Sequence, residues 1–281
     1  MSGGGTETAN SQGNDSASDS GGQEDDNQDN SSGSSVDKGE LIESELPNKI
    51  AEINSRLGII DRQGLAGLPS TTTTAVALID LSDQGVSNVD YNGDLQFTSA
   101  STYKLLVAYA MIHDVETGRR NWSSPINGTT WEGCLNQMII NSDNTCPETY
   151  LAVNGHDNLT KIAHSLGLSD STNFAVDDMR MTANDLALFL QKLYQGELVS
   201  EENRDKLLSL MQQQRYREGI PAGIGDQGVV ADKVGFLYDL LNDAAIVQSG
   251  SGDYVLVILT NGESWSYIAQ LAQYIDEIMR Q

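Results

Sequence analysis

Short runs of β-branched and apolar residues, bounded by turn residues, predict five β-strands at residues 73–80, 86–91, 229–236, 243–248 and 254–260. The last three runs follow one another too closely for helical crossovers, so we expect them to pair as an antiparallel meander. Two of the strands come from the early part of the chain and three from its end. The pattern therefore predicts one sheet assembled from both ends of the domain.

Helical periodicity fills the stretch between the early and the late strands. Residues 100–212 show no strand-like alternation, and the best-defined helices there cover 101–117, 131–140, 147–153 and 182–194. Amphipathic helices are also expected at both ends of the folded part. The first has Pro47 in its first turn and Gly58 as its stop, and the last carries an apolar stripe from Ile268 to Met279.

These elements predict an α/β (α+β) sandwich, in which terminal helices flank an antiparallel sheet of about five strands and an all-α lobe is inserted. We expect a sheet lobe at 41–97 and 213–281 and a helical lobe at 98–212. Ligand sites prefer such interfaces, so a functional cleft is expected between the lobes.

The first 40 residues differ in composition from the rest of the chain. They hold nine Ser, eight Gly and nine acidic residues but only four apolar ones, too few to offset the entropy lost on ordering. We expect 1–40 to be a disordered acidic linker and 41–281 to be the folded domain. The run from Asp25 to Asn30 resembles a calcium loop but lacks the required Gly and Glu, so it predicts no calcium site.

The net charge of the chain limits the classes of partner that it can bind. The 281 residues include 16 Lys and Arg against 40 Asp and Glu, a formal net charge of −24, which argues against binding to nucleic acid or anionic lipid. No secretory signal follows Met1 and no membrane-spanning apolar run occurs, so the chain as written is expected to be soluble. A Gly/Ser/Asp tail ahead of a folded domain would also suit a cell-surface protein whose export signal or anchor lies outside this chain.

Cysteine and histidine are too sparse for a metal centre. Cys134 and Cys146 could form one disulfide in an oxidising compartment or remain two buried thiols. The histidines His113, His156 and His164 lie outside zinc-ligand spacing and are interpreted as ordinary surface or packing residues. We therefore predict no metal and no cofactor.

The sequence around one glycine motif excludes it as a dinucleotide-binding motif. Gly223, Gly225 and Gly228 form a GxGxxG, but it precedes a strand instead of following one and opening a helix, so we interpret it as a glycine loop. No P-loop, HExxH motif or GxSxG elbow occurs in the chain, and no His suggests a Ser-His-Asp triad.

An SxxK motif at the start of a clearly predicted helix contains residues suited to nucleophilic catalysis. Ser101 and Lys104 stand one turn apart on one face, where an amine can take the serine proton and backbone N–H groups can meet an oxyanion. A second SxxK, from Ser35 to Lys38, lies in the tail and lacks this context. The alternative for Ser101 is a simple helix N-cap.

Two further motifs follow in the chain. Ser142-Asp143-Asn144 interrupts two helices and could alone be a polar turn. Lys233-Val234-Gly235 lies in a predicted strand, where Lys and Gly are unfavourable, and the glycine would let another segment approach the strand edge closely.

The order SxxK, SDN, KxG resembles the active-site-serine family of class A β-lactamases and penicillin-binding proteins, and the resemblance covers nearly all of 41–281. It implies that Ser101 is the acylated nucleophile, that Lys104 accepts or relays its proton, and that Ser142 passes the proton to the leaving nitrogen. It also implies substrate binding by Asn144 and by the segment Val234, Gly235 and Phe236, a positive potential from Lys233, and an oxyanion hole formed by the N–H groups of Ser101 and Phe236.

The resemblance has three departures. Val234 replaces the usual Thr or Ser, which removes one hydroxyl donor to a substrate carboxylate, about 0.5–1.5 kcal/mol of binding or more. No arginine occurs in 240–244, so Arg180 is the nearest candidate to clamp a carboxylate. Residues 167–181 contain no Glu, and the acids there, Asp170, Asp177 and Asp178, do not match the setting of the deacylating Glu in class A enzymes.

The leading hypothesis is therefore a monomeric serine hydrolase of the bacterial cell envelope, extracellular or cell-surface. It would form a slowly deacylating acyl-enzyme with β-lactams or with D-alanyl peptides of the peptidoglycan type. The alternatives are a D,D-peptidase or esterase-like hydrolase and a non-catalytic module that binds peptidoglycan or a protein partner. In an exported protein, a Cys134–Cys146 disulfide would brace the Ser142 turn.

Overall fold

The computed structural model describes Met1 and residues 37–57, 73–82 and 87–281. Residues 36–281 form one compact unit. Residues 2–36 of the expected acidic linker lie outside the described residues. The calcium-like run from Asp25 to Asn30 and Gly58 lie outside them as well.

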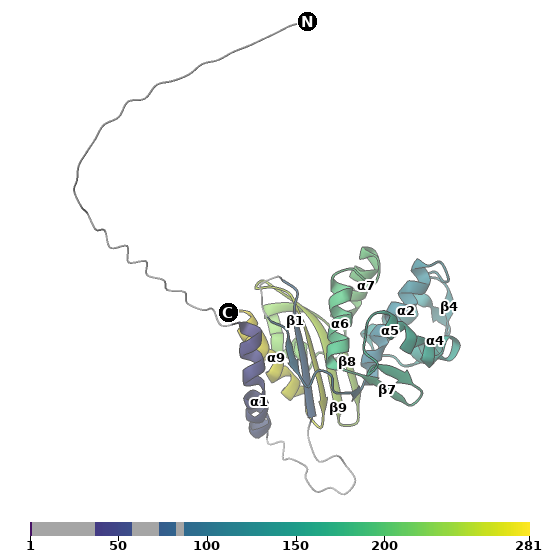
Figure 1. Ribbon diagram of the computed structural model, residues 1–281. Helices are drawn as coiled ribbons and strands as arrows, with labels where there is room; N and C mark the ends of the chain where they lie inside the picture. The colour runs from purple at the N-terminus through teal and green to yellow at the C-terminus, as the bar shows by residue number, and fades with distance from the viewer. Residues whose placement is uncertain (2–36, 58–72, 83–86) are drawn as a thin grey trace, which may run out of the picture. The chain divides into compact units, whose positions relative to one another are not determined.

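The centre of the unit is a five-stranded antiparallel sheet with the strand order β2-β1-β10-β9-β8 (Figure 1). The strands span Thr73–Asp80 (β1), Val89–Tyr91 (β2), Gly228–Leu237 (β8), Leu240–Ser249 (β9) and Tyr254–Asn261 (β10). All five predicted strands and the meander of the last three are confirmed, and β2 begins three residues later than expected. Strand β8 lies at the edge of the sheet, which leaves one side of its backbone free to meet another segment.

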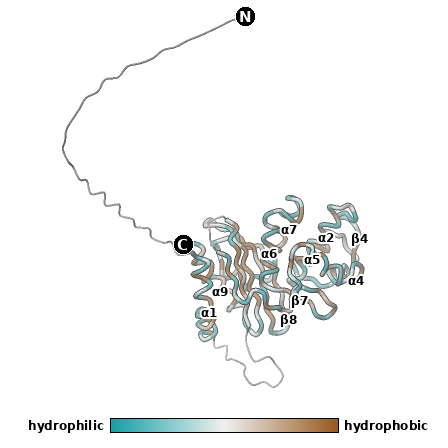
Figure 2. Tube along the Cα trace, viewed as in Figure 1, coloured by the Kyte–Doolittle hydropathy of each residue, from teal (hydrophilic) through white to brown (hydrophobic). Residues whose placement is uncertain are grey.

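One face of the sheet is covered by α1 (Lys38–Leu57), α8 (Ile220–Ile224) and α9 (Trp265–Met279). Alternation along β10 sorts the core: Leu256 and Ile258 pack with these helices, whereas Val255 and Val257 face the other side. Figure 2 shows the brown, hydrophobic segments concentrated in the strands between the helical layers. The predicted terminal helices on the sheet are confirmed.

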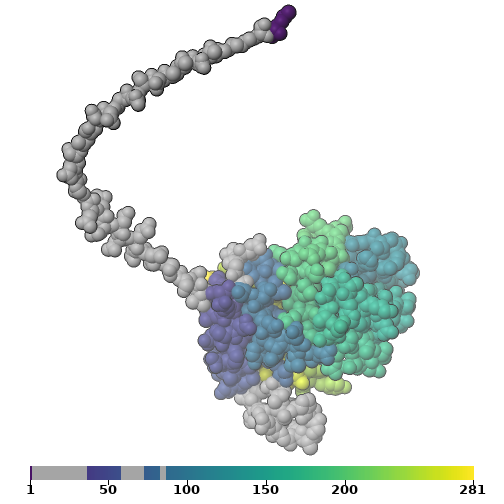
Figure 3. Space-filling model, in the orientation of Figure 1, coloured from purple at the N-terminus to yellow at the C-terminus, as the bar shows by residue number. Residues whose placement is uncertain are grey.

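The opposite face carries the inserted helices, which Figure 3 shows in teal and green beside the blue and purple N-terminal segments. They are α2 (Lys104–Glu116), α3 (Trp131–Ile140), α4 (Thr145–Asn154), α5 (His156–Ser165), α6 (Ala183–Tyr194) and α7 (Glu201–Gln212). Helix α6 packs directly on β1, β9 and β10. Helix α2 is buried along most of its length and so forms the core of this half.

The all-α description of the middle segment is wrong in detail. A three-stranded sheet joins β3 (Phe97–Thr98), β7 (Asp178–Met181) and β6 (Asn173–Ala175), and β4 (Pro125–Ile126) pairs with β5 (Thr129–Thr130). Strands of two to four residues are too short to show alternation in a sequence.

The first helix begins earlier than predicted. It starts at Lys38, with Pro47 in its interior, because the Asp37 carboxylate accepts the N–H groups of Gly39 at 2.7 Å and Glu40 at 3.2 Å. Its buried stripe runs through Ile42 and Leu46 before the proline. Ordered structure therefore begins before residue 41, the predicted domain boundary.

Candidate active site

Ser101 lies in a 3₁₀ turn, η1 (Ala100–Tyr103), which connects β3 to α2. The N–H of Lys104 donates to the carbonyl of Ser101, so the two residues are one 3₁₀ turn apart, a spacing at which side chains eclipse. The N-cap alternative for Ser101 is wrong, since the turn is capped by Ser99 and the following helix by Tyr103. Within the described residues the Ser101 hydroxyl makes no hydrogen bond, and the Lys104 amine is held by other partners.

Strands β8 and β9 hold this turn from the sheet side. A Cβ atom at Gly235 would lie 2.7 Å from the Ser99 carbonyl oxygen and 2.9 Å from the Ser101 nitrogen, so only glycine fits there. The prediction that this glycine admits a close approach is confirmed, and the approaching segment is the turn that carries Ser101. From β9, buried Asn242 donates to the carbonyl of Thr98 at 2.9 Å.

Asn242 is a positioning residue that the sequence reasoning missed. It is fully buried and also accepts the Thr260 N–H at 3.4 Å, which anchors its side chain between β10 and the Ser101 turn. Asparagine is disfavoured in strands, so the Asn-Asp pair at the start of a predicted strand was the available signal.

Two residues of the site have left-handed backbone conformations. Ala100, directly before the nucleophile, has φ 44°, and Ser142 has φ 55°. Such conformations are strained for residues other than glycine and persist only where surrounding contacts hold them. At Ser142 those contacts are hydrogen bonds from the amines of Lys104 and Lys233.

The Lys104 side chain is fully buried and points at the SDN turn. Its Nζ donates to the Ser142 carbonyl and to Asn144 Oδ1, both at 2.6 Å, and lies 3.4 Å from Ser142 Oγ. A neutral amine has two N–H donors and one lone pair. The two short bonds satisfy both donors, which leaves the lone pair free to accept a proton.

Lys233 reaches the same serine from the sheet. It is fully buried on edge strand β8, and its Nζ donates to Ser142 Oγ at 2.9 Å and to the Val234 carbonyl at 2.8 Å. Ser142 Oγ is therefore within reach of both amines. The Val234 side chain is fully buried and offers no donor, as its apolar nature implies.

Burial lowers the pKa of both lysine amines. Desolvation lowers the pKa of Lys104 to about 8, against the opposing charges of Asp143 and Glu148. Desolvation lowers the pKa of Lys233 to about 7, and repulsion by Lys104 adds to this shift. Repulsion between the two amines thus lowers the pKa of Lys233, whereas burial is what lowers the pKa of Lys104, the lysine nearer to Ser101 in the chain.

The SDN turn is fixed between α3 and α4. Cys134 and Cys146 form a disulfide with Cα atoms 5.4 Å apart, which confirms the predicted bridge. At the start of α4 the Asp143 carboxylate accepts the Thr145 hydroxyl at 2.7 Å and the Cys146 N–H at 3.2 Å. These contacts hold Ser142 and Asn144 in place, with the Asn144 side chain exposed at the surface.

Residues 167–181 comprise a connecting segment and the short β6–β7 hairpin at 173–181. His156 and His164 tie this segment to α5 through the carbonyls of Phe174 (3.0 Å) and Thr172 (2.9 Å). These contacts agree with packing roles for both histidines. Arg180 forms an ion pair with Asp178 in β7, so the structure does not bring it into contact with Ser142 or Lys233.

The outer end of β8 is apolar. The Phe236 ring is 43% exposed and packs edge-on against Tyr216 at 5.1 Å and Trp265 at 6.3 Å. Phe236 follows directly after Lys233-Val234-Gly235 in β8, whereas Tyr216 precedes α8 and Trp265 begins α9. This aromatic group offers contact area to an apolar substrate group and no positive charge to a carboxylate.

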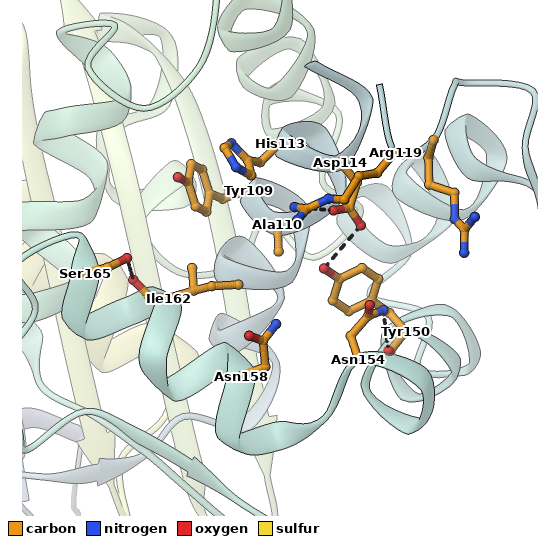
Figure 4. A pocket seen from close by; sticks show the side chains of 11 residues that line it. Tyr109, Ala110, His113, Asp114, Arg119, Tyr150, Asn154, Asn158, Ile162 and Ser165 are labelled. Atoms are coloured by element: carbon orange, nitrogen blue, oxygen red, sulfur yellow. Dashed lines mark hydrogen bonds and ion pairs between the residues drawn. The ribbon is translucent and has the colours of Figure 1, made fainter. Parts of the chain in front are cut away.

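A separate cavity of about 430 Å³ lies further along α2 (Figure 4). It includes Asp114, ten residues beyond Lys104 and so about 15 Å along the helix. Asp114 pairs with Arg119 at 2.6 Å, and Tyr150 points at the same carboxylate. This cavity therefore contains none of the motif residues.

The described residues contain neither a metal cluster nor a membrane-spanning helix. In that part of the chain no group of three or more His, Cys, Asp or Glu is placed to hold a metal ion. Among the same residues no helix has both the length and the apolar character needed to cross a membrane.

Comparison with known structures places this fold among class A β-lactamases. PBP-A matches with a TM-score of 0.68 and 24% identity over 83% of this chain and 96% of the other. A β-lactamase from Sphaerobacter thermophilus matches with a TM-score of 0.69 and 21% identity over 84% and 94% of the two chains. The fold and the three motifs thus define a serine hydrolase of the class A β-lactamase type.

Sequence comparison gives the family. The family model described as "Beta-lactamase enzyme family" matches residues 65–279, and the chain belongs to this family. Curated relatives include β-lactamase OXY-2 of Klebsiella oxytoca, 28% identical over 61% of this chain and 70% of the relative. β-Lactamase CTX-M-8 of Citrobacter amalonaticus is 27% identical over 70% and 79% of the two chains.

Proposed function

We propose that this hydrolase forms an acyl-enzyme at Ser101 with β-lactams or with D-alanyl-peptide amides. The observation that carries the proposal is the buried Lys104 amine, one 3₁₀ turn from Ser101, with both N–H donors occupied and its pKa lowered to about 8. A lysine with a pKa near 8 is partly neutral near physiological pH, and its neutral form can accept the Ser101 proton as the hydroxyl attacks the carbonyl carbon.

The neighbouring groups have complementary roles in this proposal. Ser142 Oγ, 2.9 Å from Lys233 and 3.4 Å from Lys104, relays the proton to the leaving nitrogen. The N–H groups of Ser101 and Phe236 stabilise the oxyanion, since the close contact at Gly235 brings β8 to the Ser101 turn. Asn144, exposed beside the turn, binds the side-chain amide of the substrate.

We propose further that the acyl-enzyme is slow to deacylate. The β6–β7 segment contains no Glu, Asp178 is paired with Arg180, and Asp170 is fully exposed to solvent. Water activation is therefore inefficient. A structural neighbour, a point mutant of PBP-A, is described as an acyl-enzyme complex with penicillin G, which supports a β-lactam as the first substrate to test.

A D,D-peptidase or esterase-like activity is the second candidate. It is favoured by the buried Val234 and the aromatic group around Phe236, which take the place of carboxylate donors. Substrates without a carboxylate near the scissile bond lose least at such a site. We place the protein in the bacterial envelope as a monomer, a location that agrees with the Cys134–Cys146 disulfide.

The test is intact-mass spectrometry of the protein with a fluorescent penicillin, alongside Ser101→Ala. We expect a mass increase equal to one drug molecule, which persists in the native protein and is missing in the variant. An adduct of equal size on the variant would place the nucleophile elsewhere. No adduct with the native protein, combined with turnover of a D-alanyl peptide or an ester, would favour the second candidate.

A further inference from the structure

A second cavity lies directly beside the nucleophile turn. It has a volume of about 440 Å³ and is lined by Ser99, which caps η1, by Ala100 and Tyr103 from η1, by Glu148 from α4 and by Asp177 from the β6–β7 turn. Ala100 is the residue that precedes Ser101 in the chain. The cavity therefore brings two carboxylates and room for water to the backbone that carries the nucleophile.

Among the acids around this turn, Asp143 is engaged in hydrogen bonds, whereas Glu148 and Asp177 have no such partner within the described residues. Asp143 is occupied at the start of α4, where it accepts from Thr145 and Cys146. No hydrogen bond or ion pair involves the Glu148 carboxylate in the described part of the chain. The Glu148 carboxylate is therefore available as a proton acceptor, whereas hydrogen bonds at the start of α4 hold the Asp143 carboxylate in place.

Glu148 also acts electrostatically on the catalytic turn. Its charge opposes the lowering of the Lys104 pKa and, together with burial, raises the pKa of Tyr103 to about 12. Both groups belong to the helical turn that follows Ser101. The charge of Asp177, at the tip of the hairpin, does not act on Tyr103 or Lys104 in this way.

We propose that Glu148 is the general base that activates the hydrolytic water in deacylation. This inference rests on the proposed acyl-enzyme at Ser101. The Glu148 carboxylate takes one proton from a water molecule in the cavity while the water oxygen bonds to the ester carbon. The tetrahedral intermediate then collapses, the bond from carbon to Ser101 Oγ breaks, and the proton returns from Glu148 to Oγ. The products are the free acid and the regenerated serine.

The same geometry explains why this deacylation is slow. Glu148 is exposed at the surface, so water screens its charge and the hydrolytic water is not isolated from solvent. The sequence reasoning missed this residue because it looked for the acid in 167–181, whereas Glu148 is supplied by α4, six residues after Ser142.

The experiment follows the lifetime of the penicillin adduct by intact mass in the native protein, in Glu148→Gln and in Asp177→Asn. Glutamine keeps the size of the side chain and removes the base. Asp177→Asn removes the other carboxylate of the cavity, and asparagine tolerates the left-handed backbone there, φ 64°. Thermal unfolding of each variant checks that the fold is retained.

We expect Glu148→Gln to lengthen the adduct lifetime about 100-fold, the low end of general base catalysis, with acylation changed by less than about threefold. Asp177→Asn should behave like the native protein. An unchanged lifetime in Glu148→Gln, or an equal change in Asp177→Asn, would overturn the role of Glu148 and leave the proposed acyl-enzyme at Ser101 standing. Failure of the native protein to form any adduct would overturn the proposed function and this inference together.

Discussion

Strand β8 separates two buried charge clusters of opposite sign. Within β8, the adjacent residues Asp232 and Lys233 project to opposite faces of the sheet, as successive residues of a strand do. On one face, the front cluster consists of Lys104, Ser142 and Lys233. On the other, the back cluster consists of Arg217, Asp232 and Asp243.

The two clusters satisfy their polar groups differently. In the front cluster each lysine has two close acceptors, all of them neutral. In the back cluster Asp232 pairs with Arg217 at 2.5 Å and Asp243 accepts the Ile220 N–H at 2.8 Å. One oxygen of each carboxylate has no hydrogen-bond partner among the described residues.

Burial moves the pKa values of the two clusters towards each other. It raises the pKa of Asp243 to about 7 and that of Asp232 well above its usual value, while it lowers the pKa of both lysines. The charges of Asp232 and Asp243 raise the pKa of Lys233 through the strand. The back cluster thus limits how readily the active site loses its protons, although it touches no substrate.

The largest effect should come from the front cluster. Lys104→Met keeps the length of the side chain and removes the base, so we expect acylation by penicillin to fall about 10²–10⁴-fold. Lys192→Met, at a lysine paired with Glu197 on the surface, is the control and should acylate normally. Acylation of the Lys104 variant within about tenfold of the native rate would mean that another group takes the Ser101 proton.

The disulfide anchors the front cluster from outside the sheet. Replacing Cys134 and Cys146 by Ala should lower the free energy of unfolding by about 3 kcal/mol, the entropy of closing a loop of this size. Urea unfolding measures the change. Because the Ser142 turn loosens, acylation should slow as well, and a variant that is destabilised but acylates at the native rate would show that the bridge does not position the turn.

Asn242 holds the nucleophile turn from β9. Asn242→Ala leaves the carbonyl of Thr98 without this donor and should lower the free energy of unfolding by about 1–3 kcal/mol, with a parallel loss in acylation rate. Chemical denaturation and adduct formation are measured on the same samples. Full acylation at the native rate would show that Gly235 alone keeps the turn in place.

The back cluster should affect stability in a way that depends on pH. The folded-state pKa of Asp243 is raised to about 7. The folded protein therefore keeps a proton that the unfolded chain releases, and stability falls as pH rises from the unfolded pKa towards 7, by at most about 1.4 kcal/mol per pH unit. Asp243→Asn removes this loss, so the variant should gain stability over the native protein as the pH rises to 7.

The matching measurement is urea unfolding of both proteins across this pH range. Because Asp243 raises the pKa of Lys233, the same variant should also shift the pH dependence of acylation to lower pH. A stability difference that does not change with pH would show that Asp243 titrates normally in the fold.

Much of the fold could be predicted because its long elements have clear periods. The four long strands of the main sheet and helices such as α3 and α9 extend over eight or more residues, enough to show an apolar run or stripe. The start of α1 lies upstream of the predicted one, because the Asp37 cap sets it and Pro47 lies in the helix interior. The small β3–β7–β6 sheet is held by tertiary contacts that leave no pattern in two to four residues.

For the site, residue types and order sufficed to single out Ser101, Lys104, Ser142 and Lys233. The first two motifs fall at helix boundaries, and the third places Lys and Gly inside a strand, where both are unusual. Spacing could not show that Lys104 bonds to Asn144, nor that Asn242 anchors the nucleophile turn. Such contacts join segments far apart in the chain. They depend on how the sheet edge meets the helices, which a local pattern does not record.

The most direct test of the lysine pair is the acylation rate of Ser101 as a function of pH, from about pH 5.5 to 9.5. The pKa of Lys233 is about 7 and that of Lys104 about 8, so the coupled pair should carry a single proton between these values. In the reactive form of this singly protonated pair, Lys104 is neutral and accepts the Ser101 proton, while Lys233 is the ammonium that provides positive potential. We predict a bell-shaped profile with limbs near pH 7 and pH 8. A rate that is constant across this range would contradict a proton-accepting lysine in the active site.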